Sequence, residues 1–148
     1  MNVVKQFSVS LVNRPGVLAN ICRSLADSKV NILALTIADS ADLGILRMVV
    51  NNPESARNAL SRLDAPVNES DVLWIEIPNR TGALAGIIEK LSLAHINIDY
   101  AYVTTGAANG KATAIIKVQY PEKVMKVLKE NESSSEKRVV LRPTLNRR

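Results

Sequence analysis

Hydrophobic and polar residues follow one another in an order that predicts alternating strands and helices along the first half of this chain. Residues 4–12 alternate between the two kinds, as in a strand with one buried face. A proline and a glycine at 15–16 interrupt this alternation, and apolar residues then recur at helical spacing. Continued in this way, the pattern predicts strand, helix, strand, strand, helix and strand over residues 4–12, 17–28, 32–38, 44–50, 53–63 and 65–70.

The second half of the chain shows the same order of patterns. A strand pattern over 73–77 is followed by a helical stripe of apolar residues over 84–91. An Asn-Gly pair, which is a strong turn signal, predicts a hairpin between the segments 98–105 and 111–120. We then expect a helix from Pro121, a loop, a closing strand and a frayed end, over residues 121–131, 132–136, 139–141 and 144–148.

A repeat explains why the two halves look alike. Residues 13–19 read NRPGVLA and residues 79–85 read NRTGALA, at a constant offset of 66 residues. The offset continues without a gap to the Asn-Ile pairs at 31–32 and 97–98, and nine positions between 13 and 32 are identical in both copies. The chain therefore holds two copies of one module.

Each copy reads strand-helix-strand-strand-helix-strand. Right-handed crossovers give such a unit an antiparallel sheet of four strands with both helices on one face, the ferredoxin-like arrangement of the α+β class. We place the modules at residues 1–69 and 70–142, followed by a basic tail at 143–148. Domains this small are marginally stable alone, so we expect the copies to pack on each other or to form a homodimer.

The formal net charge of +5 does not indicate a nucleic-acid partner. Residues 137–148 carry five basic groups and no acidic one, which leaves 14 basic groups to balance the 14 acidic groups of the rest. This distribution is typical of a solvated tail on a neutral body. RNA-binding proteins of the same topology need aromatic residues on their central strands, and this chain has only five aromatic residues in all.

Composition also excludes several other classes of site. No segment is long and apolar enough to cross a bilayer, the N-terminus lacks a signal pattern, and one cysteine excludes an internal disulfide, so we expect a cytoplasmic protein. A single histidine, His95, and the lack of a His-Cys-Asp cluster predict neither a metal site nor a cofactor. We find no arginine-bearing anion loop of the acylphosphatase kind, and we expect no catalytic residue.

The repeated turn offers chemistry suited to a carboxylate. The backbone N–H groups of Gly16, Val17 and Leu18 open a helix, where they lack intrahelical partners and the helix dipole adds partial positive charge. Asn13 adds an amide beside them, and Asn31, at the start of the next strand, could accept a hydrogen bond from an ammonium group.

Asn13 and Asn31 cannot reach one small ligand within a module. They should lie at opposite ends of the sheet, about 18 Å apart for a helix of about 12 residues. The strand that begins at Ile32 should be an unpaired edge of its sheet, and two such edges pairing antiparallel would bring the turn of one module near the asparagine of another. We therefore expect a ligand site shared between modules.

These residues resemble those of the ACT domain, a family of regulatory modules that bind amino acids and serve enzymes of amino-acid metabolism. The resemblance rests on the turn at 13–18 and the Val-Asn-Ile at 30–32, and it covers nearly the whole chain twice. It implies a tandem ACT protein that senses a free amino acid allosterically and acts as a homo-oligomer or on a partner enzyme. The ligand contacts it implies are Asn13, Gly16, Val17, Leu18, Asn31, Ile32, Asn79, Gly82, Ala83, Leu84, Asn97 and Ile98.

Two alternatives remain open, together with the roles of three aromatic residues. The chain could be the regulatory subunit of a biosynthetic enzyme such as acetolactate synthase, or, more weakly supported, an RNA-binding protein. Trp74 lies on the face opposite Leu73, where it would form an interface patch rather than a lid on a ligand. Tyr100 and Tyr102 lie where they could tune the choice of ligand in the second copy.

Overall fold

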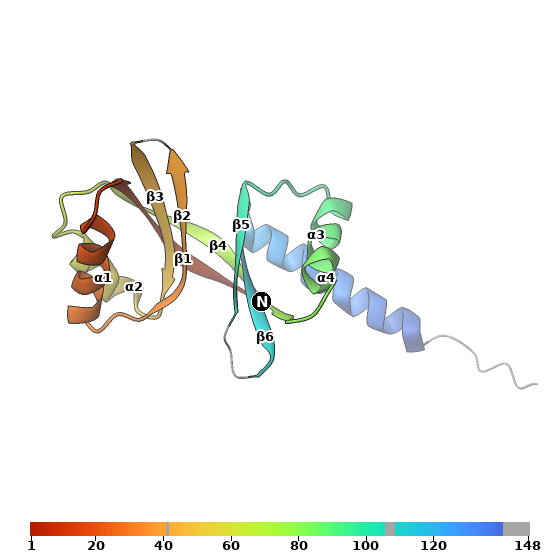
Figure 1. Cartoon of the computed structure of the whole chain (residues 1–148). Helices are drawn as coiled ribbons and strands as arrows, with labels where there is room; N and C mark the ends of the chain where they lie inside the picture. The colour runs from red at the N-terminus through yellow and green to blue at the C-terminus, as the bar shows by residue number, and fades with distance from the viewer. Residues whose placement is uncertain (41, 106–108, 141–148) are drawn as a thin grey trace, which may run out of the picture.

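The computed structural model describes residues 1–40, 42–105 and 109–140, and it confirms the predicted succession of strands and helices (Figure 1). The predicted frayed end and basic tail at 143–148 lie outside the described residues. The elements are β1 (Asn2–Val12), α1 (Val17–Asp27), β2 (Ile32–Ser40), β3 (Leu43–Val50), α2 (Pro53–Leu60), β4 (Val67–Pro78), α3 (Ala83–Leu93), β5 (Tyr100–Thr105), β6 (Lys111–Lys117) and α4 (Pro121–Val140).

All six strands form one antiparallel sheet in the order β2-β3-β1-β4-β6-β5, so the two predicted sheets are joined. Strand β4 makes the join, because its first part pairs with β1 and its last part, from Leu73, pairs with β6. The predicted separate strands at 65–70 and 73–77 are therefore wrong. No glycine or proline lies between Val67 and Ile77 to end the strand. The division into modules at 69/70 falls inside this strand and stays a prediction.

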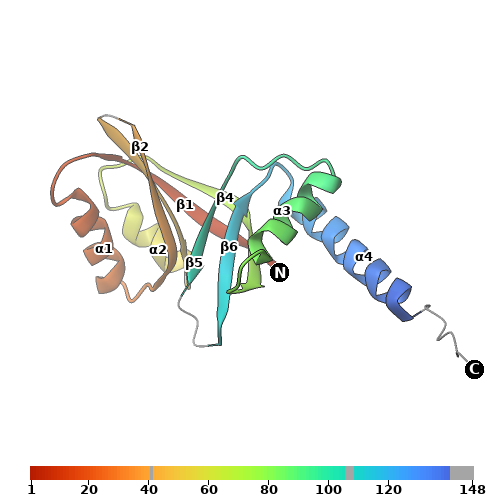
Figure 2. The same ribbon diagram turned by 45° about the vertical axis from the view of Figure 1, so that its right-hand side comes forward.

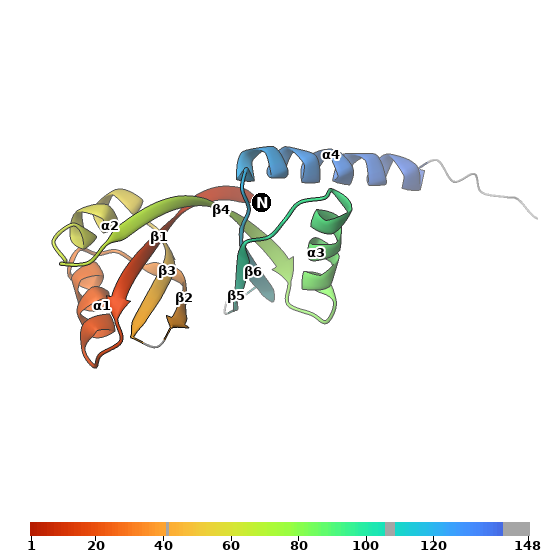
Figure 3. The same ribbon diagram turned by 90° about the horizontal axis from the view of Figure 1, so that it is seen from above.

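The sheet bends at β1 and β4 into two arms, and the helices cover its outer face (Figures 1 and 3). Helices α1 and α2 lie outside the first arm, and α3 and α4 lie outside the second (Figure 3). Each arm has its own core against its helices, one centred on Phe7, Leu25 and Met48 and the other on Leu73 and Leu91. Each module thus keeps both helices on one face, as the ferredoxin-like fold requires.

Helix α4 departs from the prediction. It runs without interruption through the predicted loop at 132–136 and includes residues 139 and 140 of the predicted closing strand, whose last residue lies outside the described ones (Figure 2). No glycine or proline follows Pro121 until Pro143, so nothing in this segment ends a helix. The position beside β4 that a closing strand would take is partly occupied, because Asn2 and Val4 of β1 pair there with Trp74 and Val72.

The repeat is visible in the backbone as well as in the sequence. Gly16 and Gly82, which precede α1 and α3, both have left-handed conformations, with φ of 90° and 83°. Lys29 and His95, which follow these helices, are the two non-glycine residues with positive φ among those the structure describes, at 57° and 55°. Each copy of the first helix therefore begins and ends with the same backbone geometry.

Candidate functional site

The copied turns present open backbone at the starts of α1 and α3. Gly16 and Gly82 are the N-cap residues of α1 and α3, and no side-chain hydrogen bond caps either helix. A Cβ added at either glycine would meet no heavy atom within 4 Å, so the space beside the backbone is free. The left-handed φ explains why both copies have glycine, because other residues adopt this conformation at a cost.

In each turn, one of the three backbone N–H groups expected to be free donates a hydrogen bond within the turn itself. The N–H of Val17 donates to the carbonyl of Arg14 at 3.4 Å, and that of Ala83 donates to the carbonyl of Arg80 at 3.2 Å. The expectation that Val17 offers an unpaired N–H is therefore wrong, although a bond of 3.4 Å is long. The next amide, that of Leu18, still lacks an intrahelical acceptor because it lies in the first turn of α1.

Asn13 lies in a small cavity at the first turn. Its backbone N–H donates to the carbonyl of Asp42 at 3.3 Å, which ties the turn to the β2–β3 connection. The cavity has a volume of about 240 Å³, and Asn13, Arg14, Leu18 and Ile37 are among its lining residues. Of the predicted contacts, the structure brings Asn13 and Leu18 together here.

Asn79 is held in the corresponding way in the second module. Its N–H donates to the carbonyl of Gly110 at 3.0 Å, so this turn is tied to the β5–β6 connection.

Asn31 lies away from the Asn13 cavity, as its place in the sequence predicts. The Asn31 N–H donates to Oδ1 of Asn51 at 2.9 Å, and the Asn51 N–H donates to the Asn31 carbonyl at 3.1 Å. Strand β2, which follows, is an edge of the sheet, as predicted. Its Leu35 and Ile37 are 40% and 42% exposed, so this edge leaves apolar surface uncovered.

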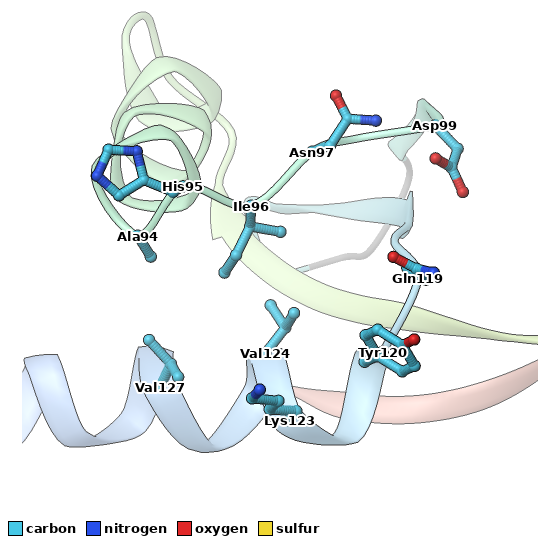
Figure 4. Close-up of a pocket in the computed structure, with 10 residues that line it drawn as sticks. All are labelled: Ala94, His95, Ile96, Asn97, Asp99, Gln119, Tyr120, Lys123, Val124 and Val127. Carbon is cyan, nitrogen blue, oxygen red and sulfur yellow. The ribbon is translucent and has the colours of Figure 1, made fainter.

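Asn97 lines a larger cavity in the second module, of about 580 Å³, between the α3–β5 connection and α4 (Figure 4). Asp99, Gln119 and Lys123 also line it, together with the apolar side chains of Ile96 and Val124. Asn97 thus borders a cavity, although its exposed side chain points away from α4 (Figure 4), whereas Asn31, its copy, is tied by its backbone to Asn51. Asn79 and Gly82 do not line this cavity, so the predicted contacts of the second module are not gathered in one place.

A polar cluster on the inner face of the sheet joins the two modules. The Gln6 Nε2 donates to the Tyr100 hydroxyl at 2.6 Å, and the Tyr102 hydroxyl donates to Gln6 Oε1 at 2.9 Å. The guanidinium of Arg47 lies 4.0 Å from the centre of the Tyr100 ring. Burial, and secondly the neighbouring Tyr100, raise the pKa of Tyr102 above its ordinary value of 10.0.

Sequence reasoning missed Gln6 and Arg47. Both lie on the strand face opposite the module core, where the alternation of residues predicts exposure, yet Gln6 is fully buried. The packing of one module on the other buries it, and a pattern within one strand does not reveal such packing. The expected interface role of Trp74 is confirmed, because it packs on an apolar cluster of Ala34, Val72 and Ile115 that spans both modules.

The part of the chain that the structure describes offers neither a cluster of metal ligands nor a membrane-spanning helix. No group of three or more histidine, cysteine, aspartate or glutamate residues there could hold a metal ion. No helix there is long and apolar enough to cross a membrane.

Comparison with known proteins identifies relatives over nearly the full length. The family model described as "ACT domain pair" matches residues 1–140. Protein BT0572 from Bacteroides thetaiotaomicron is 38% identical, and the alignment covers 88% of this chain and 89% of that one with a TM-score of 0.80. No curated protein matches the chain.

More distant structures share the fold. The ligand-free regulatory subunit of aspartate kinase from Thermus thermophilus is 13% identical, with 88% of this chain and 97% of that one covered and a TM-score of 0.62. A structure of aspartokinase alpha and beta subunits is 19% identical, with 88% and 96% covered and a TM-score of 0.59. At these identities the likeness concerns the fold alone.

Proposed function

Because the chain belongs to the ACT domain pair family, we propose that it binds a free amino acid and thereby regulates an enzyme, and that it catalyses no reaction itself. The observation that carries this proposal is the first turn, where an uncapped helix start, free space beside Gly16 and the cavity at Asn13 occur together. The cavity of about 240 Å³ is smaller than the roughly 300–1,000 Å³ of pockets for drug-sized ligands, and so suits a small metabolite.

We propose the following ligand contacts. The carboxylate of the amino acid would accept hydrogen bonds from the Leu18 amide and the Asn13 side chain, at the positive end of α1. Ile37 would contact its side chain. In full, the proposed contacts are those of both turns and both strand openings: Asn13, Gly16, Val17, Leu18, Asn31, Ile32, Asn79, Gly82, Ala83, Leu84, Asn97 and Ile98.

A second copy of the chain would complete the site. Asn13 and Asn31 do not line one cavity within a chain, and the cavity at Asn13 is lined by first-module residues only. Antiparallel pairing of two β2 edges would cover the exposed Leu35 and Ile37 and bring the turn of one chain near the strand opening of the other. The protein would then act as a homodimer whose pairing the ligand strengthens.

The regulated target would be a separate enzyme. Regulatory subunits of aspartate kinase have the same fold at nearly the same length, which supports the idea that an ACT domain pair can act as a subunit by itself. The RNA-binding alternative is less well supported, because the aromatic residues of the inner face, Trp74, Tyr100 and Tyr102, contact neighbouring residues of this chain instead of lying on an open sheet.

Calorimetric titration of the full chain tests the turn site. With each of the twenty protein amino acids as titrant, at least one should bind, and Asn13→Ala should weaken it about ten-fold or more through loss of a hydrogen bond to a charged group. Asn58→Ala, at an exposed position of α2, is the matched control and should bind as the unchanged protein does. Equal affinities for the Asn13→Ala and unchanged proteins would remove Asn13 from the site.

A further inference from the structure

The cavity beside Asn97 is built differently from the matching place of the first module, where Asn51 and Pro53 line another cavity, of about 360 Å³, together with residues of β1 and Trp74. Pro53 and Pro121 open the corresponding helices α2 and α4, so Gln119 matches Asn51. In the first module, two hydrogen bonds between Asn31 and Asn51 connect the start of β2 to the segment that precedes α2. In the second module, Asn97 and Gln119 instead both line the cavity of about 580 Å³.

The start of the helix differs in the same way. Asn52 caps α2, since its Oδ1 accepts a hydrogen bond from the Ser55 N–H at 3.1 Å. Tyr120 takes the matching position before α4, and tyrosine is not among the residues that cap helices. The second module thus has neither the asparagine pair nor the asparagine cap that the first module has at this place.

The walls of the cavity combine two opposite charges with an apolar surface. Ile96, Val124 and Val127 point toward one another across it, while Lys123 lies on the α4 side and Asp99 at the end near Gln119 (Figure 4). In the part of the chain that the structure describes, neither the Lys123 ammonium nor the Asp99 carboxylate takes part in an ion pair. Both side chains are exposed, so water solvates them in the free protein, and a ligand that carries a negative and a positive group can form a charge-assisted hydrogen bond with each.

We infer that this cavity of the second module is a second ligand site for a small zwitterion: an α-amino acid with an apolar side chain. Lys123 donates to the carboxylate, Asp99 accepts from the ammonium group, and the side chain of the ligand packs on Ile96, Val124 and Val127. The inference shares its ligand class with the proposed function but uses neither of the copied turns, so each can fail without the other.

The site also lies next to the contact between modules. Asp99 directly precedes Tyr100, whose hydroxyl accepts a hydrogen bond from Gln6 of the first module and whose ring lies under Arg47. A ligand held by Asp99 would therefore restrict the first residue of β5 and, through it, the packing of the two modules. The single tryptophan, Trp74, packs on the apolar cluster at this contact and can report the change by fluorescence.

In the test, the full chain is titrated with each of the twenty protein amino acids, and binding is measured by calorimetry and by Trp74 fluorescence. Asp99→Asn and Lys123→Gln should each weaken binding of an apolar amino acid about ten-fold, since each removes a charge-assisted hydrogen bond. Glu89→Gln and Lys126→Gln remove the same charges from exposed positions outside the cavity and should leave affinity unchanged. Val127→Phe, which fills the cavity without changing its charge, should abolish this binding while the melting temperature stays within a few degrees.

Derivatives of the amino acid that binds assign each charge. Its N-acetyl form, which lacks the ammonium group, should bind weakly and with equal affinity to the unchanged protein and to Asp99→Asn. Its methyl ester, which lacks the carboxylate, should bind weakly and with equal affinity to the unchanged protein and to Lys123→Gln. Affinity that falls in Asn13→Ala but not in Asp99→Asn, Lys123→Gln or Val127→Phe would overturn the second site and leave the turn site standing. Affinity that falls only in the latter three would support the second site and refute the turn site, and no binding of any amino acid would overturn both.

Discussion

Replacing Gln6 with leucine should destabilise the protein by about 1–3 kcal/mol. Leucine has a similar size, so the change removes the two hydrogen bonds with the tyrosine hydroxyls, and a long one of 3.5 Å to Ser8, rather than opening a large cavity. Each of the two shorter bonds contributes about 0.5–1.5 kcal/mol net. The two bonds, to the hydroxyls of Tyr100 and Tyr102, connect the first module to the second, and Gln6 is fully buried between them. The loss should therefore weaken the packing of one module on the other.

Urea unfolding followed by Trp74 fluorescence measures this effect, because the tryptophan lies at the same contact. Gln119→Leu, which changes the exposed second glutamine of the chain, is the matched control and should shift stability by less than about 0.5 kcal/mol. In a double-mutant cycle, Gln6→Leu and Tyr102→Phe should show a coupling energy of at least about 0.5 kcal/mol. A Gln6→Leu protein as stable as the unchanged one, with no coupling to Tyr102, would refute this account of the contact.

Three further changes test other parts of the structure. The raised pKa of Tyr102 means that its stabilising contribution is complete below the ordinary tyrosine pKa of 10.0 and is lost as the pH rises above it, so the fall of stability in alkaline urea titrations should be shallower in Tyr102→Phe. Asn52→Ala should cost about 0.5–2 kcal/mol in thermal unfolding by removing the cap of α2, and a loss indistinguishable from zero would contradict the capping role. Gly82→Ala should cost about 1–2 kcal/mol because alanine must adopt the left-handed φ of 83°, although free space surrounds the position; an unchanged melting temperature would show that the turn relaxes.

Local patterns predicted those parts of the fold that depend on local physics. The alternation in β1, the stripe of α1 and the glycine turns each follow from a few neighbouring residues, and the structure has all of them. The constant offset between the copies then predicted the shape of the second module up to β6.

The remaining features depend on contacts between distant segments. Strand β4 runs through both modules because nothing interrupts it, and β1 pairs along its first part, which takes up part of the place of a closing strand. Gln6 is a polar residue on a strand face whose sequence pattern predicts exposure, and only the packing of the two arms of the sheet buries it. Likewise, the cavity at Asn97 arises from the course of α4, which no periodicity near Asn97 indicates.

The central claim is that this ACT domain pair holds a free amino acid, and thermal unfolding in the presence of each of the twenty protein amino acids tests it most directly. A ligand present at 100 times its dissociation constant should stabilise the protein by about 2.7 kcal/mol, which would raise the melting temperature by several degrees for one or a few related amino acids. Unchanged melting temperatures with all twenty at saturating concentrations would contradict the claim.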